Sequence, residues 1–165
     1  MEDFYPALFR EIGRPNIILD LACGLHPFAL PWMGLAPETE YYAMDVDHRL
    51  ISLANDFFVR MGRSPTAGCR DILVSPPDRK ADVVFLLKSI PCLEQQEKGI
   101  GARLLRGLHA RYAVVSFPVR TLGGRDKGMR RHYERLVTRM VDELGLPVHK
   151  MAYPTEIFYI CPMPK

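Results

Sequence analysis

The 165-residue chain is 48% apolar and 25% charged, as in an ordinary globular protein, and its length predicts a single domain over residues 1–165. No apolar run approaches the roughly 18 residues of a membrane span, and Glu2 and Asp3 stand where a secretory signal carries basic residues, so we expect a cytoplasmic protein. The net charge of +3 is too small to identify a binding partner by itself.

The first predicted strand–helix unit follows a short amphipathic helix over residues 4–12. Residues 16–21 are predicted to form the first strand, and its centre, residues 17–19, is apolar without alternation, which predicts a strand covered on both faces of a sheet. The small residues Ala22, Cys23 and Gly24 come next, and they allow a backbone turn to approach a ligand closely. A short helix then begins near residue 27, which completes a pattern typical of nucleotide-binding α/β domains.

The second predicted strand, residues 41–45, ends in a carboxylate. Asp45 lies 21 positions after Gly24, close to the spacing at which an acidic residue reaches a ribose hydroxyl. A helix with one apolar stripe follows over residues 47–61, and Asp47 is a suitable N-cap for it. The spacing therefore predicts a sugar-binding carboxylate at Asp45, with helix capping as the alternative.

The rest of the chain continues the alternation of strands and helices. Strands are predicted over residues 67–70, 83–87 and 112–117, helices over 90–108 and 129–144, and a closing antiparallel pair over 148–153 and 156–161. Gly99 and Gly101 are expected to interrupt the first of these helices. This order predicts an α/β fold, a mostly parallel sheet with a C-terminal antiparallel strand and helices on both faces. With one glycine in the first turn instead of a dinucleotide fingerprint, it favours a Rossmann-like class I methyltransferase over a dehydrogenase.

A basic cluster lies between residues 120 and 139. It contains two acidic residues and seven basic ones. The basic residues are Arg120, Arg125, Lys127, Arg130, Arg131, Arg135 and Arg139. Such an excess is typical of a surface that binds a polyanion. The charge alone is equally consistent with a solvated helix face.

Five blocks of the sequence resemble the 16S rRNA guanine-N7 methyltransferases that confer aminoglycoside resistance. The blocks follow one another in the order of that family: residues 20–33, 44–58, 87–99, 115–134 and 156–160. The Q-E-K-G and G-R-D-K-G-M runs within them are the most specific. The resemblance spans residues 16–160, and it implies the same fold, S-adenosyl-L-methionine as cofactor and guanine-N7 methylation at the ribosomal decoding site.

The resemblance also implies a set of cofactor-binding residues: Ala22, Gly24, Asp45, Asp71, Ile72, Leu87 and Gln96. Ala22 and Gly24 correspond to positions that line the methionine part of the cofactor, and a plain tight turn is the alternative for them. Asp45 corresponds to the residue that accepts hydrogen bonds from both ribose hydroxyls.

The remaining four positions are implied to surround the adenosine. Asp71 is expected to accept a hydrogen bond from the adenine amino group, with the Ile72 backbone beside it; a surface carboxylate is the alternative. Leu87 is expected to lie against the adenosine or the sulfonium, although a role in the core is nearly as plausible. Gln96 is expected to reach the cofactor from the following helix.

Contacts with RNA are expected from basic residues near the same end of the sheet: Lys88, Arg120, Arg125, Lys127, Arg130 and Arg131. Lys88 follows a buried strand, where it meets a phosphate or extends to water. His26 stands where the family usually has asparagine. It lies close to the methyl acceptor or has a structural role.

The expected reaction needs no catalytic side chain. Guanine N7 carries an available lone pair and loses no proton before attack, so positioning of the two reactants is sufficient. The sequence shows no Ser-His-Asp constellation and no metal-binding pattern. The cysteines are expected to be reduced and mostly buried: Cys23, Cys69, Cys92 and Cys161.

Members of the family carry a helical N-terminal domain that docks on the ribosomal subunit, and this chain begins where that domain ends. The first hypothesis is an rRNA methyltransferase that acts on the 30S subunit, with a possible accessory protein in place of the N-terminal domain. The alternatives are a methyltransferase for a small molecule or another RNA, and a non-catalytic S-adenosylmethionine-binding protein that needs a partner.

Overall fold

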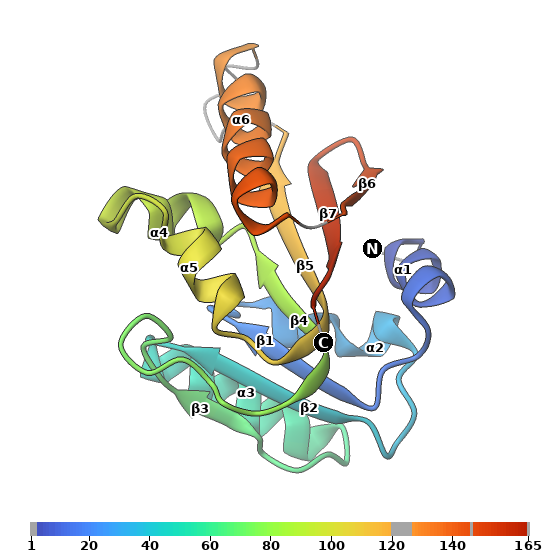
Figure 1. The fold of residues 1–165 in the computed structure, drawn as a ribbon. Coiled ribbons are helices and arrows are strands. Elements are labelled where there is room, and N and C mark those ends of the chain that lie inside the picture. The colour runs from blue at the N-terminus through green and yellow to red at the C-terminus, as the bar shows by residue number, and fades with distance from the viewer. Residues whose placement is uncertain (1–2, 120–126, 146, 165) are drawn as a thin grey trace.

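The computed structural model describes residues 3–119, 127–145 and 147–164, with side chains from residue 133 onward in the last helix. Its strands form one seven-stranded sheet in the order β3-β2-β1-β4-β5-β7-β6 (Figure 1). Their bounds are β1 (Ile17–Leu21), β2 (Glu40–Asp45), β3 (Ala67–Cys69), β4 (Ala81–Leu87), β5 (Ala110–Pro118), β6 (His149–Ala152) and β7 (Glu156–Pro162). The first five strands are parallel and β7 is antiparallel to both of its neighbours. The predicted sheet is confirmed, including the closing antiparallel pair.

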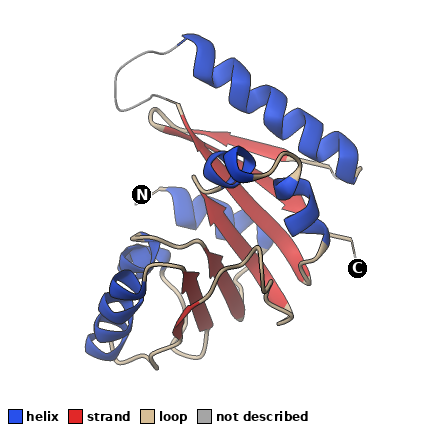
Figure 2. Cartoon of the chain, turned by 90° about the vertical axis from the view of Figure 1, so that its left-hand side faces the viewer, coloured by secondary structure: helices blue, strands red, loops and turns tan. Residues whose placement is uncertain are grey.

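Helices cover both faces of this sheet, as predicted (Figure 2). They are α1 (Phe4–Ile12), the 3-10 helix η1 (His26–Ala29), α2 (Leu30–Met33), α3 (His48–Arg60), α4 (Ile90–Gln96), α5 (Ile100–Arg106) and α6 (Lys127–Leu144). The core places α1, α2 and α3 on one face and α4, α5 and α6 on the other. Within the described residues, no helix combines the length and the apolar character that a membrane span requires.

Two local features explain where α3 and α5 begin. The Asp47 side chain accepts a hydrogen bond from Arg49 N at 2.9 Å, which confirms its predicted role as N-cap. Gly99 has a φ of +81°, a left-handed conformation that ends the preceding turn. The Glu94 carboxylate then accepts from the N–H groups of Gly99 (3.0 Å) and Gly101 (2.9 Å). The predicted interruption near Gly99 is therefore confirmed, and a side-chain cap stabilises it.

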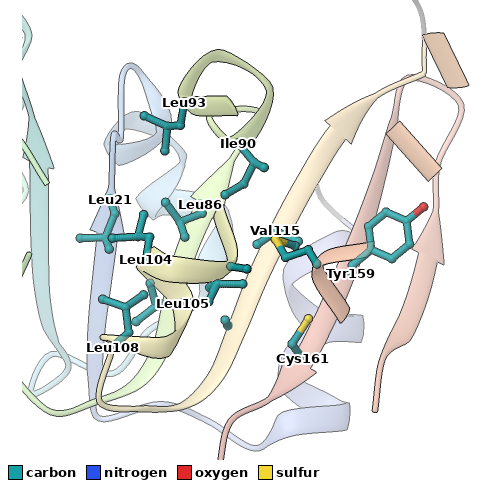
Figure 3. Packing of buried hydrophobic residues seen from close by; sticks show 14 of the residues in the cluster. Leu21, Leu86, Ile90, Leu93, Leu104, Leu105, Leu108, Val115, Tyr159 and Cys161 are labelled. Atoms are coloured by element: carbon teal, nitrogen blue, oxygen red, sulfur yellow. The ribbon is translucent and has the colours of Figure 1, made fainter. Parts of the chain in front are cut away.

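The central strands are apolar without alternation because both of their faces are buried. In β4, Val84 and Leu86 point toward α4, α5 and α6, whereas Val83 and Phe85 point toward α1, α2 and α3. Figure 3 shows the first of these layers, in which leucines of α5 pack over Leu86.

The expectation about the cysteines is half right. All four thiols are free, and Cys23 and Cys161 are buried. Cys69 and Cys92 are exposed, so the thiols are not mostly buried. Cys69 ends β3, which is an edge strand of the sheet, and Cys92 lies in α4.

Asp82 connects β4 to the start of β1. Its Oδ2 accepts from the N–H groups of Asn16 (2.8 Å) and Ile17 (3.1 Å), and its Oδ1 accepts from Arg111 at 3.2 Å. Burial by itself raises the pKa of Asp82, but the two backbone N–H groups and the guanidinium outweigh it and lower the pKa.

We expect Asp82→Asn to lower the free energy of unfolding by about 1 kcal/mol at pH 7. A depressed pKa in the folded state means that the stabilisation is present above the unfolded-state pKa and is lost as the pH falls through the folded-state pKa. The difference between variant and wild type should therefore decrease as the pH falls, measured by urea denaturation between pH 7 and pH 3. Asp78→Asn removes the same charge from a side chain that is 98% exposed and is the control. A difference independent of pH contradicts the prediction.

Candidate functional site

A cavity of about 310 Å³ opens at the carboxyl ends of β1 and β4. Its size lies at the lower end of the range for small-molecule sites, and its place is where ligands bind in open α/β sheets. The wall combines the turn after β1 with side chains of α1, β4 and β7: Tyr5, Ala22, Gly24, Leu87, Lys88 and Glu156 among them.

The turn after β1 is held by a carboxylate from β2. Ala22 and Gly24 have φ values of +48° and +51°, so this short turn contains two residues in the left-handed region. Asp45 Oδ2 accepts from Gly24 N at 2.8 Å, and Oδ1 accepts from Asp47 N at 3.0 Å. Each carboxylate oxygen can accept another hydrogen bond. The turn and Asp45 therefore form one rigid unit that retains acceptor capacity.

A buried chain of polar groups lies beneath this turn. The Tyr41 hydroxyl donates to Asp20 Oδ2 at 2.6 Å, and His26 Nδ1 lies 2.9 Å from the same oxygen. The other ring nitrogen of His26 lies 2.8 Å from the Tyr5 hydroxyl. Burial, followed by the charge of Asp20, raises the pKa values of Tyr5 and Tyr41, so both tyrosines are neutral. His26 therefore joins α1 to the end of β1, which favours the structural role among those considered for it.

The local charge around the turn is negative. Burial raises the pKa of Cys23 most, and the carboxylates of Asp20 and Asp45 raise it further. Asp20 Oδ1 is buried and accepts no hydrogen bond from the described residues. Two carboxylates near one small cavity favour a ligand that carries positive charge.

Three polar residues stand at the ends of the neighbouring strands β4, β5 and β7. Ser116 Oγ accepts from Lys88 N at 3.0 Å and donates to Glu156 Oε1. Lys88 Nζ lies 3.4 Å from Glu156 Oε2. The backbone of Lys88 has a φ of +56°, a strained conformation for a residue with a side chain. Such strain is common at functional sites, and here the hydrogen bonds that Lys88 N donates to the carbonyl and hydroxyl oxygens of Ser116 maintain it.

The structure brings together part of the predicted set of residues. Ala22, Gly24 and Leu87 line the cavity with Lys88, and Asp45 is bonded to the glycine turn. The contacts that these residues were predicted to make with a cofactor stay predictions.

Asp71 and Ile72 lie farther along the same end of the sheet, after β3. The Asp71 side chain is exposed and accepts from Leu73 N at 2.9 Å, whereas Ile72 packs in the core. Gln96 is exposed at the end of α4 and lines a separate groove beside Tyr133 of α6. The structure does not bring Gln96 to the cavity, and its cofactor contact stays a prediction.

The predicted RNA-binding residues are described only in part. Arg120 and Arg125 lie outside the described residues. Lys127, Arg130 and Arg131 belong to the first turns of α6, and their side chains lie outside the described part of the chain. The helix itself begins at the end of the sheet where β4 and β5 end (Figure 1). Lys88 is 58% exposed at the same end.

Sequence reasoning did not find the contributions of α1 and β7. Phe4 stacks on Phe158 with ring centroids 3.9 Å apart, and Tyr5 and Glu156 also line the cavity. The apolar stripe of residues 4–12 predicted a buried helix face but gave no indication of which strands that face covers. The position of Glu156 at the start of the last strand was the available signal, because β7 is antiparallel and therefore starts at the ligand-binding end.

The bond between Tyr5 and His26 can be tested by removing one oxygen atom. We expect Tyr5→Phe to lower the free energy of unfolding by about 1 kcal/mol, because it leaves a buried ring nitrogen of His26 without its partner. Chemical denaturation measures this change. Tyr153→Phe is the control, because Tyr153 packs edge-on against the same Phe4 ring and is only half-buried. Equal effects of the two substitutions contradict the prediction.

The strand order and the cavity at the carboxyl ends of β1 and β4 define a class I methyltransferase fold. A family model described as "Ribosomal RNA methyltransferase (FmrO)" matches residues 1–160, and the chain belongs to this family.

Relatives support this assignment. The chain is 38% identical over 160 residues to a 16S rRNA (guanine(1405)-N(7))-methyltransferase of Micromonospora rosea, covering 97% of this chain and 58% of the relative. The corresponding protein of Micromonospora echinospora is 36% identical with the same coverage. The crystal structure of the 16S rRNA methyltransferase RmtF in complex with S-adenosyl-L-homocysteine superposes with a TM-score of 0.82 at 34% identity, covering 96% of this chain and 62% of that chain. The chain thus spans about three fifths of the length of these relatives.

Proposed function

We propose that this chain binds S-adenosyl-L-methionine and transfers its methyl group to N7 of a guanine in 16S rRNA. The observation that carries the proposal is the unit of Asp45 and the Ala22–Gly24 turn at the wall of a cavity, in a chain of the FmrO family. The proposed partner is the 30S subunit, and the proposed location is the cytoplasm.

The residues present fit this cofactor. Its sulfonium and amino groups are cationic, and the carboxylates of Asp20 and Asp45 make the surroundings of the turn negative. Asp45 accepts from the ribose hydroxyls while the turn faces the methionine part, and Leu87 gives an apolar contact beside it. Asp71 and the Ile72 backbone hold the adenine, and Gln96 completes the proposed set from α4.

The chemistry asks for positioning more than for proton transfer. S-adenosylmethionine supplies a methyl group that its sulfonium already activates. Guanine N7 attacks with its own lone pair, so no residue of this chain acts as a general base, and none is proposed as catalytic. The strand ends that hold Leu87 and Lys88 fix the geometry of approach. A base extruded from its stack could enter such a cavity.

A contact with the RNA is proposed for Lys88. Phosphate contacts are proposed for the basic residues around the start of α6: Arg120, Arg125, Lys127, Arg130 and Arg131. These contacts fix the position of the RNA on the protein and make binding dependent on salt.

The proposal is tested by incubating the purified chain with 30S subunits, free 16S rRNA and a metabolite extract, each with methyl-labelled S-adenosylmethionine. We expect label in 16S rRNA as N7-methylguanine, identified by mass spectrometry of nuclease digests. Label in a metabolite supports the small-molecule alternative and contradicts the proposal. Binding of S-adenosylhomocysteine without any turnover contradicts it in favour of a non-catalytic binding protein. Turnover that requires added cell extract assigns the reaction to the chain together with an accessory protein.

The doubly reversed variant Arg125→Glu/Lys127→Glu separates RNA binding from cofactor binding. We expect it to lower the methylation rate of 30S subunits by more than about tenfold, since two attractive charges become repulsive toward phosphate. Its affinity for S-adenosylhomocysteine, measured by calorimetry, should stay within about twofold of the wild type. Unchanged methylation contradicts the proposed phosphate contacts.

A further inference from the structure

The polar group formed by Lys88, Ser116 and Glu156 is not accounted for by cofactor binding. It lies on the far side of β4 from the glycine turn, because the strand order runs β1, β4, β5, β7. Lys88 and Glu156 nevertheless line the same cavity as that turn. The two charged side chains therefore face the part of the cavity that a second reactant has to occupy.

The three side chains differ in how far they are exposed to solvent. Ser116 is fully buried, and its hydroxyl holds both the Lys88 backbone and Glu156 Oε1. The Glu156 side chain is 16% exposed, whereas that of Lys88 is 58% exposed. Their ion pair, at 3.4 Å, is longer than a well-formed hydrogen bond. A mostly buried acceptor held by Ser116 thus stands beside an exposed donor on a long side chain, which can turn toward a ligand.

We propose that Glu156 and Lys88 read the Watson–Crick edge of the target guanine. Glu156 accepts from N1–H and from the 2-amino group, and Lys88 donates to O6. This inference rests on the proposed function, because it takes guanine as the methyl acceptor. An ionised carboxylate only accepts hydrogen bonds and an ammonium only donates them, so the pair matches guanine. Adenine has a donor at position 6, an acceptor at N1 and no 2-amino group, so it opposes both residues.

The order of groups around the base agrees with the order of the strands. In guanine, N7 is followed by O6, N1–H and the 2-amino group along adjoining edges. Across the sheet, the proposed cofactor side at β1 is followed by Lys88 at the end of β4 and Glu156 at the start of β7. A base with N7 toward β1 therefore places O6 near Lys88 and its N–H donors near Glu156.

The test measures nucleotide binding without methyl transfer. The full chain is saturated with S-adenosylhomocysteine and titrated with GMP, IMP and AMP, and dissociation constants are obtained by ligand-observed NMR. IMP lacks only the 2-amino group of GMP, and AMP lacks the 6-oxo group as well. We expect the wild type to prefer GMP over IMP by about fivefold or more, and AMP to bind most weakly. No preference among the three nucleotides overturns the proposal, as does no measurable binding of GMP.

Two substitutions assign the two contacts. Glu156→Gln should weaken GMP binding by about tenfold and IMP binding by less, because the amide presents only one acceptor. Lys88→Met should weaken GMP and IMP by the same factor and leave AMP unchanged, since the first two share O6. Glu38→Gln, which removes the same charge from an exposed side chain remote from the cavity, is the matched control. An unchanged ratio of GMP to IMP affinity in Glu156→Gln overturns the role of Glu156.

Two further measurements show whether a weaker affinity comes from misfolding of a variant or from failure of the proposed function. Affinity for S-adenosylhomocysteine and the midpoint of thermal unfolding should match the wild type within about twofold and a few degrees. If Glu156→Gln does not fold, Glu156→Asp retains the charge with a shorter reach and should lose part of the preference for GMP. If the chain discriminates among the nucleotides but does not methylate rRNA, only the proposed substrate is contradicted. If it methylates N7 but Glu156→Gln leaves the ratio of GMP to IMP affinity unchanged, only this inference is contradicted.

Discussion

Replacing Asp45 with alanine is expected to lower the affinity for S-adenosylhomocysteine by about 100-fold or more. Two hydrogen bonds from ribose hydroxyls to a carboxylate contribute about 1.5–3 kcal/mol each, and 1.4 kcal/mol corresponds to a factor of ten. The substitution also releases Gly24 N, whose bond to Asp45 Oδ2 measures 2.8 Å. The turn that faces the methionine part then loses its support from β2. Isothermal titration calorimetry at 25 °C measures the change directly.

The neighbouring Asp47 provides the control. Its side chain caps α3 and pairs with Arg49, whereas the Asp45 side chain accepts from Gly24 N in the turn. Asp47→Ala should therefore leave the affinity within about twofold of the wild type, because the N–H group that Asp45 accepts from belongs to the Asp47 backbone. Asp45→Ala with an unchanged affinity would place the ligand elsewhere and would contradict the assignment of the cavity.

The strands of this fold could be predicted because each carries its own local signal. Residues 83–87 are apolar without alternation, and β4 is indeed covered on both faces in the middle of the sheet. Gly99 was predicted to interrupt the helix, and in the structure its left-handed conformation separates α4 from α5. Asp47 was predicted as an N-cap from its place directly before the apolar stripe of residues 47–61, and the structure confirms it. These features depend on backbone geometry within a few residues, and a single sequence contains that information.

The remaining part of the site depends on contacts between distant segments. Tyr5 and His26 are 21 positions apart, and Ser116 and Glu156 are 40 apart. Nothing in the local pattern of residues 4–12 shows that this helix packs beside the turn after β1. Gln96 was predicted to contact the cofactor from its place in the sequence; its side chain lies at another groove, and that contact stays a prediction. Residues whose roles come from apposition across the fold need the structure to reveal them.

Phe85 of β4 links the core to the site, because it packs edge-on against the His26 ring with centroids 5.1 Å apart. Phe85 is fully buried in the layer under α1, α2 and α3. It therefore supports His26 from the sheet while Tyr5 contacts the ring from α1. A cavity opened at this position affects both the packing of the sheet and the polar groups beneath the glycine turn.

Phe85→Ala is accordingly expected to lower the free energy of unfolding by about 3–5 kcal/mol, which is the cost of the lost contacts and of the cavity that remains. Domains of this kind have a total stability of about 5–15 kcal/mol, so a large fraction of the margin disappears. Urea denaturation at pH 7 and 25 °C measures the change. Leu53→Ala, in α3 and 51% exposed, is the control and should stay within about 0.5 kcal/mol of the wild type. A cost below about 1 kcal/mol for Phe85→Ala would show that β4 is not enclosed on the face that carries His26, and the support of the glycine turn would then need another source.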